Sequence, residues 1–366
     1  MTSNEVNPQF WKNKKVLITG HTGFKGGWLT FWLFHLGAKV TGCSLEPTTE
    51  PNLFNALKLD ELCDHHICDI RDLDALKKLF EKTKPDVVFH LAAQPLVLES
   101  YDIPVETYAT NVMGTVNLLE ACRLLDYPIQ SVVISTTDKV YENISQVKGY
   151  RENDRLGGRD PYSNSKACTE LVISSYRDSF FSPSNPHSKP TLIISARAGN
   201  VFGGGDWSKN RIIPDCAVSF SKNEPVILRN PESVRPWQFV SEPLRGYLLL
   251  AQQDPEVRTN KQISQAWNFG PKDEDCLPVK KLAEIMRDSW GGDASVTIVQ
   301  NPTALHEEVF LKLDSGYANS HLKWVRKVNT VDGLKMSAEW YKAFYQKVSV
   351  SKLREITLSQ LNFVNI

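Results

Sequence analysis

Two residues of complementary chemistry lie four positions apart in a stretch that favours a helix. Tyr162 and Lys166 have the spacing that brings side chains to one helix face. A tyrosine acts as a base near neutral pH only if its pKa is lowered, and a neighbouring ammonium lowers it electrostatically. The pair is therefore a candidate for proton transfer. A Tyr-x-x-x-Lys match can also arise by chance in a chain with 11 tyrosines, so its surroundings decide its weight.

A hydroxyl and an acid precede this pair at the end of an expected strand. The apolar run Ser131–Ser135 leads into Thr136-Thr137, one connection before Tyr162, and Asp138 and Lys139 follow directly. A hydroxyl at a strand end can meet a substrate. Asp138-Lys139 could instead be an ordinary loop pair of opposite charge. The predicted catalytic set is Thr137, Asp138, Lys139, Tyr162 and Lys166.

A glycine-rich segment, Gly20-His21-Thr22-Gly23-Phe24-Lys25-Gly26, separates the apolar run Lys15–Thr19 from a helical stretch. In a dinucleotide-binding fold, glycines here allow a tight turn and a close approach of the backbone to a pyrophosphate. The helix N-terminus then offers free N–H groups to the anion. The spacing is Gly-x-x-Gly-x-x-Gly, and a plain turn between strand and helix is the alternative. The alternating chain around it favours a dinucleotide cofactor.

The residues after the second and third expected strands bear on which dinucleotide is bound. No acidic residue ends the second strand to hold a ribose hydroxyl, since Ser44 occupies that neighbourhood and Glu46 comes slightly late. No arginine replaces it to hold a 2′-phosphate, which favours NAD over NADP. Asp69 follows the third strand and is placed to meet the adenine, although it could equally cap a helix that begins before Asp72.

Strands and helices alternate through the first two hundred residues. Continuous apolar strands separated by helices indicate a parallel sheet covered on both faces. We therefore expect an α/β fold with a Rossmann-type, doubly wound parallel sheet and a smaller, interleaved C-terminal lobe that binds substrate. The expected strands are Lys15–Thr19, Val40–Cys43, His66–Cys68, Asp86–Leu91, Ser131–Ser135 and Leu192–Ser195.

The pattern becomes irregular after Gly199. Val226–Leu228 and Trp237–Val240 are expected to pair around a turn at 229–231, and Ser241 is expected to cap the next helix. Trp267–Phe269 is expected to return to the sheet. The predicted dinucleotide-binding domain spans 10–199 with returning elements near 236–270, and the substrate lobe spans 200–235 and 271–350.

Composition excludes several classes of protein. The chain has 42 basic and 42 acidic residues, so no basic surface is expected to bind a nucleic-acid polymer. Its seven cysteines are never spaced as Cys-x-x-Cys, and neither His65-His66 nor Glu307-Glu308 has partners at metal-ligand spacing, so no metal site is predicted. Residues 1–10 lack the apolar core of a signal peptide, and no apolar run approaches the ~20 residues of a membrane span. A cytoplasmic location is expected.

Several segments together resemble the extended short-chain dehydrogenase/reductase superfamily, and within it the CDP-glucose 4,6-dehydratases. The resemblance extends from about residue 10 to about residue 345. It rests on the glycine-rich segment, Leu91-Ala92-Ala93, Asn111, Thr137-Asp138-Lys139, Tyr162 with Lys166, Arg197–Gly203, Gly203-Gly204-Gly205-Asp206-Trp207 and Arg235-Pro236-Trp237-Gln238.

The resemblance implies a reaction in three stages. Tyr162 takes the C4 hydroxyl proton of a nucleotide hexose while hydride passes to NAD⁺, and Thr137 supports the carbonyl. Asp138 protonates the leaving C6 hydroxyl, a base removes the C5 proton, and hydride returns to C6. Dehydratases that use dTDP-glucose have a Glu base after this Asp, whereas this chain has Lys139. A lysine serves as a base only if its pKa is depressed, so whether Lys139 is the base or positions one stays open.

The remaining binding predictions concern cofactor, substrate and self-association. Arg235 is predicted to bind the diphosphate of CDP-glucose, with a surface ion pair as the alternative, and Asn200 and Arg211 to contact the sugar nucleotide. Trp237 could equally be core packing. The predicted cofactor-binding residues are Gly20, Thr22, Gly23, Phe24, Lys25, Gly26, Asp69, Ile70, Leu91, Ala92, Ala93, Asn111, Ser135, Tyr162 and Lys166.

The resemblance also implies a homodimer or a dimer of dimers. Helices near Val105–Leu125 and Tyr162–Ser179 would pair across a two-fold axis, with a face that includes Val112, Val116, Leu119 and Leu171, although burial within one subunit is an alternative. The product would serve deoxysugar synthesis for the O-antigen of lipopolysaccharide. The competing functions are a nucleotide-sugar 4-epimerase, which needs no acid at Asp138, and a redox-sensing regulator, which needs neither Tyr162 nor Lys166.

Overall fold

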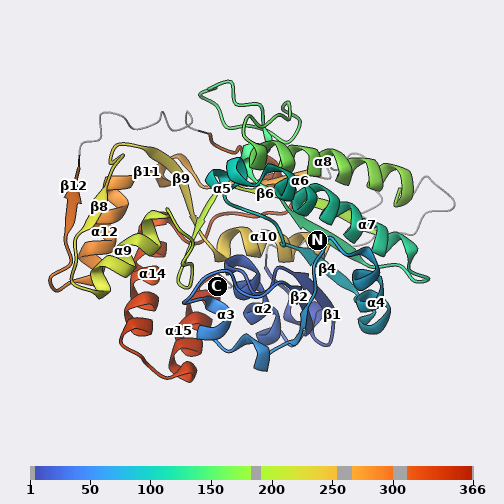
Figure 1. Ribbon diagram of the computed structural model, residues 1–366, viewed down its shortest axis with the longest axis horizontal. Helices are drawn as coiled ribbons and strands as arrows, with labels where there is room; N and C mark the ends of the chain where they lie inside the picture. The colour runs from blue at the N-terminus through green and yellow to red at the C-terminus, as the bar shows by residue number, and fades with distance from the viewer. Residues whose placement is uncertain (1–4, 183–190, 254–265, 300–310, 365–366) are drawn as a thin grey trace.

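Seven parallel strands form the central sheet of the computed structural model, which describes residues 5–182, 191–253, 266–299 and 311–364 (Figure 1). The strand order is β10-β6-β5-β4-β1-β2-β3, with every neighbouring pair parallel, so the predicted α/β class is confirmed. The strands are β1 (Lys15–Thr19), β2 (Lys39–Ser44), β3 (Asp64–Ile67), β4 (Val87–His90), β5 (Ser131–Ser135), β6 (Leu192–Ala198) and β10 (Ala266–Phe269).

Helices cover both faces of this sheet because alternate strand residues point to opposite sides. Leu17 packs in one hydrophobic cluster with α4 (Leu73–Thr83), α7 (Gly114–Leu124) and α8 (Pro161–Phe180). Its neighbours Val16 and Ile18 pack in a second cluster with α2 (Phe24–His35) and α10 (Ser241–Ala251). The other helices of this part are α1 (Pro8–Trp11), α3 (Leu53–Ala56), α5 (Val97–Asp102) and α6 (Pro104–Tyr108), with short turns at Leu59–Glu61, Ala109–Met113 and Asp138–Val140.

The smaller lobe contains a three-stranded sheet of order β11-β9-β7 and a two-stranded sheet, β12-β8. Its strands are β7 (Asn200–Phe202), β8 (Val226–Leu228), β9 (Val234–Phe239), β11 (Cys276–Pro278) and β12 (Val296–Ile298). Its helices are α9 (Ile212–Ser221), α12 (Val279–Trp290), α13 (Gly316–His321) and α14 (Thr330–Tyr345), with a short turn at Asp273–Asp275.

Two local predictions for this lobe are wrong. β8 and β9 do not pair around 229–231: β8 pairs with β12, and β9 pairs with β7 and β11, all supplied from distant parts of the chain. Ser241 does not cap α10, because Val240 already has helical angles (φ −56°, ψ −33°) and Ser241 is the first helical residue. The return of Trp267–Phe269 to the main sheet, as part of β10, is confirmed.

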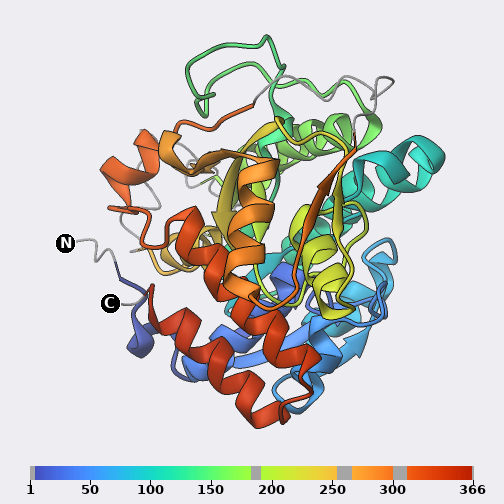
Figure 2. The ribbon, with the colours of Figure 1, turned by 90° about the vertical axis from the view of Figure 1, so that its left-hand side faces the viewer.

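The C-terminal helices join the two parts of the molecule. α14 and α15 (Val350–Asn362) run beside the N-terminal segments in Figure 2. Arg354 of α15 donates hydrogen bonds to the carbonyls of Leu57 and Lys58, and Trp340 of α14 lies against Gly204. In the described part of the chain, no helix combines the length and apolarity needed to cross a membrane. All seven cysteines are unpaired thiols.

Candidate active site

The glycine turn lies at the carboxyl end of β1, next to the end of β4. Gly20 has a φ of +77°, and a Cβ there would lie 2.7 Å from the Ala92 nitrogen. A Cβ on Gly26 would lie 2.0 Å from the Gly20 carbonyl oxygen. Both positions therefore require glycine. Gly23 is the N-cap of α2, so the first N–H groups of a twelve-residue helix are presented where a pyrophosphate would bind in a dinucleotide fold.

Side chains of the turn tie it to β2 and β3. The Thr22 hydroxyl hydrogen-bonds the Ser44 hydroxyl at 2.7 Å and donates to the Leu45 carbonyl. The buried His21 Nε2 lies 2.6 Å from Nδ1 of His65, and burial first, then His65, lowers the pKa of His21 to about 3. A Cβ on Gly42 would lie 2.2 Å from the His21 ring. The His21–His65 contact was not predicted. Its signal in the sequence was Gly42, because a glycine inside a strand often marks a place where another group approaches the backbone closely.

Several of the other predicted cofactor residues have partners within the protein. Asp69 is bound by Arg71 through its guanidinium, which lowers the pKa of the Asp69 carboxyl. Asp72, not Asp69, caps α4. Ile70 is buried against Gly114. Asn111 is buried, accepts from the Gln94 N–H and donates to Ser165 of α8. Leu91, Ala92 and Ala93 are partly buried after β4.

The partly buried Lys25 and the buried Lys166 meet at Ser135, the last residue of β5. Lys25 Nζ donates to the Ser135 hydroxyl at 2.9 Å, and Lys166 Nζ donates to the Ser135 carbonyl at 3.2 Å. Tyr247 of α10, which was not predicted, places its hydroxyl 3.1 Å from the same serine hydroxyl. Burial, followed by repulsion from Lys25, lowers the pKa of Lys166 to about 7. Burial and Arg211 lower the pKa of Lys25 to about 8.

Tyr162, Thr137 and Asp138 form a connected group beside these lysines. The Thr137 hydroxyl donates to Asp138 Oδ1 at 2.9 Å, and the Thr137 side chain is near enough to the Tyr162 phenol to act on its pKa. Burial raises the pKa of Tyr162 to about 12, against the lowering effects of Thr137 and Arg211. The expected lowered pKa of Tyr162 is therefore not seen in this structure, because burial outweighs the lowering effects of the Thr137 side chain and of the Arg211 charge. The tyrosine, the threonine and the acid lie close together, as the sequence predicts.

The Asp138 carboxylate is enclosed by the chain that follows β6. Asp138 is buried, and a Cβ on Gly199 would lie 2.9 Å from Asp138 Oδ2. Gly199 therefore makes room for this carboxylate. Lys139 is only partly buried and borders a small recess with Gly158 and Arg159. The acid and the lysine thus differ in environment although they are adjacent in the chain.

The three predicted substrate contacts occupy different positions. Arg211 precedes α9, lies 3.3 Å from Asp206, and its charge acts on both Tyr162 and Lys25. Arg235 lies on β9 and donates to the Val234 carbonyl. Asn200 begins β7 and is partly buried. Arg211 is thus the predicted substrate contact whose charge acts on Tyr162. The Trp237 indole donates to the Leu277 carbonyl, as expected of core packing.

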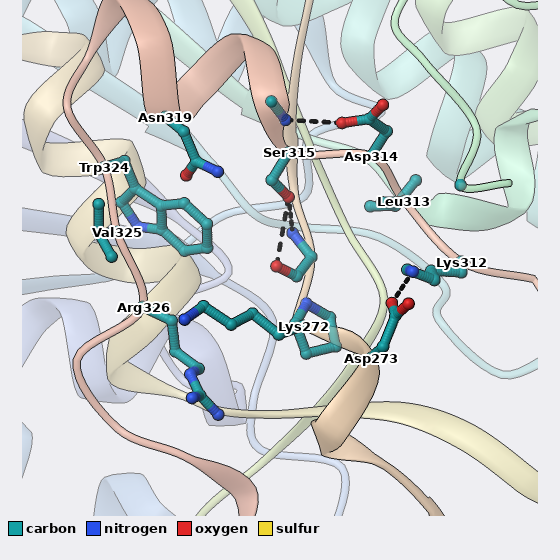
Figure 3. Close-up of a pocket in the computed structure, with 14 residues that line it drawn as sticks. Lys272, Asp273, Lys312, Leu313, Asp314, Ser315, Asn319, Trp324, Val325 and Arg326 are labelled. Atoms are coloured by element: carbon teal, nitrogen blue, oxygen red, sulfur yellow. Dashed lines mark hydrogen bonds and ion pairs between the residues drawn. The ribbon is translucent and has the colours of Figure 1, made fainter.

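A separate cavity of about 370 Å³ lies at the carboxyl end of β10 (Figure 3). Lys272, Lys312 and Arg326 contribute to its lining, but Asp273 pairs with Lys312, and Glu274 and Asp275 pair with Arg326. None of the predicted catalytic residues lines it. Among the described residues, no group of three His, Cys, Asp or Glu side chains could hold a metal ion. The pair Glu307-Glu308 lies outside the described residues.

Comparison with known proteins finds one family and several related folds. Residues 17–337 match the model of the GDP-mannose 4,6 dehydratase family. The chain is 47% identical over 354 residues to the CDP-glucose 4,6-dehydratase of Salmonella typhimurium, covering 96% of this chain and 98% of that protein. The solved UDP-glucose 4-epimerase of Thermotoga maritima has a TM-score of 0.75 at 22% identity, covering 90% of this chain and 99% of its own. A dTDP-glucose 4,6-dehydratase of Streptomyces venezuelae, with NAD bound, has a TM-score of 0.72 at 23% identity, covering 89% and 96%.

Proposed function

Because the chain belongs to the GDP-mannose 4,6 dehydratase family of nucleotide-sugar 4,6-dehydratases, we propose that it converts CDP-D-glucose to CDP-4-keto-6-deoxy-D-glucose. The observation that carries this proposal is that Thr137 binds the Asp138 carboxylate and also acts on the pKa of Tyr162. A dehydratase needs a base for the C4 hydroxyl and an acid for the C6 hydroxyl of the same sugar. The structure brings one candidate for each task together on a single threonine.

NAD is the cofactor that the glycine turn fits. The requirement for glycine at positions 20 and 26, together with the start of α2, provides the backbone approach and the N–H groups that a pyrophosphate needs. Ser44, the last residue of β2, hydrogen-bonds Thr22, and the next two residues, Leu45 and Glu46, are not basic, which supports NAD over NADP. When bound, the cofactor accepts a hydride from C4 and returns it to C6.

The first stage of the reaction is assigned to Tyr162, Thr137 and Lys166. Tyr162 removes the proton from the C4 hydroxyl, and the Thr137 hydroxyl hydrogen-bonds the oxygen as it becomes a carbonyl. The Lys166 ammonium, held by the Ser135 carbonyl, favours the tyrosinate and holds the cofactor ribose. Oxidation at C4 makes the C5 proton acidic, because that proton is now α to a carbonyl.

The second stage is assigned to Asp138 and Lys139. Asp138 delivers a proton to the C6 hydroxyl, which leaves as water. Lys139, the next residue along the chain, is our candidate to accept the C5 proton, and its partial exposure distinguishes it from the buried acid. Proton removal at C5 and water loss at C6 together give the unsaturated intermediate that receives the returning hydride.

The choice of CDP-glucose rests on the 47% identity to the Salmonella enzyme. Arg211, whose charge reaches Tyr162, is proposed to contact the sugar nucleotide together with Asn200, and Arg235 to bind the diphosphate. The test is to incubate purified protein and NAD⁺ with CDP-, dTDP-, GDP- and UDP-hexoses and to compare kcat/KM for a 4-keto product. Preference for dTDP-glucose would overturn the substrate, and a 4-epimer without a 4-keto product would support the epimerase instead.

Self-association through α5 to α8 is also proposed. Large apolar side chains on these helices are exposed, including Leu98, Tyr101, Val105 and Leu171, the last at 61%. Leu119 is buried within the subunit, which is the alternative that the sequence left open, and it does not belong to such a face. Burial of this face in a two-fold dimer would remove it from water. Analytical ultracentrifugation at micromolar concentration tests the dimer, and a monomer would contradict it.

The setting of the reaction stays a prediction from the sequence. A cytoplasmic location is predicted from the lack of apolar segments, and a role in O-antigen synthesis from the resemblance. Measuring the sugar composition of lipopolysaccharide in a deletion strain would test the second. An unchanged content of deoxyhexose would contradict it.

A further inference from the structure

Glu170 lies on the same face of α8 as the two residues proposed for the C4 oxidation. Tyr162, Lys166 and Glu170 follow at intervals of four, which places them in line on one side of the helix. Glu170 is 5% exposed. A carboxylate so far from water is costly unless several groups bind it, so its partners indicate what it is for.

Three side chains bind this carboxylate through four hydrogen bonds. The Thr136 hydroxyl donates to Oε1 at 2.5 Å, and the Ser195 hydroxyl donates to Oε2 at 2.7 Å. Arg197 donates through Nε and Nη2 to the two oxygens, at 3.0 Å and 2.8 Å. Burial opposes the charge, but Arg197 and these hydrogen bonds outweigh it, so the pKa of Glu170 lies below its usual value. The carboxylate is ionised and fully held.

These bonds connect the two halves of the proposed reaction site. Thr136 directly precedes Thr137 and Asp138 on the segment that follows β5. Glu170 belongs to the helix that carries Tyr162 and Lys166, and its charge also favours the Lys166 ammonium. Arg197, which binds the same carboxylate, also donates a hydrogen bond to the Tyr141 hydroxyl. Tyr141 is the first residue after the Asp138–Val140 turn. Glu170 therefore joins the strand end, the helix and the following loop.

We propose that Glu170 is a positioning residue, which sets the distance between the Tyr162–Lys166 face of α8 and the Thr137-Asp138 segment and helps keep Lys166 charged. The proposal rests on the proposed function, since it concerns the geometry of that reaction. A positioning role for Glu170 differs in one respect from a purely structural role of the buried Glu170–Arg197 pair. Of the four hydrogen bonds to the Glu170 carboxylate, the one from Thr136 comes directly from the segment that carries Thr137 and Asp138.

Thr136 and Ser195 offer a matched comparison. Both hydroxyls are buried and donate to Glu170, but Ser195 lies within β6 and carries no catalytic neighbour. Thr136→Val and Ser195→Ala each remove one such bond, so we expect similar losses of Tm. We expect kcat for the 4-keto product to fall at least about tenfold in Thr136→Val and less than about twofold in Ser195→Ala, because small displacements of reacting groups are costly. Thr136→Ser, which keeps the hydroxyl, should restore kcat.

Glu170→Gln tests the electrostatic part. The charged or titratable groups near Lys166 are Lys25 from α2, His90 from β4, and Tyr162 and Glu170 from its own helix. Loss of the carboxylate should lower the pKa of Lys166, so the alkaline limb of the kcat profile should move to lower pH. The proposal would be overturned if the alkaline limb of kcat in Glu170→Gln stayed at its wild-type pH, or if Thr136→Val and Ser195→Ala lost kcat equally. If wild-type protein made no 4-keto product from any nucleotide hexose, the proposed function would fail instead.

Discussion

Lys25 and Lys166 both donate a hydrogen bond to Ser135. Lys25 binds its hydroxyl at 2.9 Å, and Lys166 binds its carbonyl at 3.2 Å. Lys25 comes from the glycine turn and Lys166 from α8, so the cofactor-binding and proton-transfer parts of the site share this serine. The two ammonium groups repel each other in a buried setting. Lys166 is therefore the group whose charge is lost first as the pH rises, since its pKa is about 7 and that of Lys25 is about 8.

Lys25→Met should move the alkaline limb of activity to higher pH. Lys166 is an ammonium below its pKa and becomes neutral as the pH rises through it, so activity that needs the ammonium declines there. Removing the Lys25 charge removes a repulsion and raises the pKa of Lys166. The measurement is kcat between pH 6 and 10 at saturating NAD⁺. A limb displaced to lower pH would contradict this reading of the lysine pair.

Tyr162→Phe should abolish C4 oxidation while leaving the fold and the cofactor bound. The change removes one hydroxyl, on which Thr137 acts, and leaves the ring packing in place. We expect kcat to fall by ~10²–10⁴ or more, as for a lost general base. Single-turnover absorbance of NADH at 340 nm reports the oxidation, and fluorescence titration reports cofactor binding. Full turnover by this variant would remove Tyr162 from the mechanism.

Asp138→Asn should separate oxidation from water loss. Oxidation at C4 needs Tyr162 and not an acid at C6, so reduced cofactor and 4-keto hexose should still form. Water loss should slow by ~10²–10⁴ because the amide cannot supply the proton. Rapid-quench analysis of the nucleotide sugars follows both steps. An equal slowing of the two steps would make Asp138 a structural residue.

Gly199→Ala should act through Asp138. The added Cβ would lie 2.9 Å from Asp138 Oδ2, so the carboxylate must move, whereas the Cβ added in Gly157→Ala would lie 3.4 Å from the Glu142 Cβ. We expect dehydration to fall by at least ~10-fold in Gly199→Ala, with NAD⁺ affinity unchanged, and Gly157→Ala to retain activity. The comparison is made on kcat and on the dissociation constant for NAD⁺. Equal activity of the two variants would show that the site tolerates movement of Asp138.

Much of the sheet could be predicted because its signals are local. The apolar runs at Lys15–Thr19 and Ser131–Ser135 correspond to β1 and β5 residue for residue. The glycine turn was recognisable because backbone geometry at Gly20 excludes other residues. The proximity of Tyr162 to Thr137 followed from a parallel sheet, since its carboxyl ends meet at one edge.

What could not be predicted depends on contacts between distant segments. β8 pairs with β12, about seventy residues later, and adjacent apolar runs around a turn gave a misleading preference for a hairpin. The His21–His65 contact, the meeting of Lys25 with Ser135 and the Glu170 network all join residues far apart in the chain. The raised pKa of Tyr162 depends on burial, which spacing alone does not report.

The central claim is that one sugar is oxidised at C4 and reduced at C6 within a single active site. Deuterium placed at C4 of CDP-D-glucose tests it most directly, with the product examined by NMR and mass spectrometry. We predict that the deuterium is recovered at C6 of a 4-keto-6-deoxy product, with no net consumption of NAD⁺ and with C5 acquiring a proton from solvent. Deuterium retained at C4, or lost to solvent, would contradict the dehydratase mechanism.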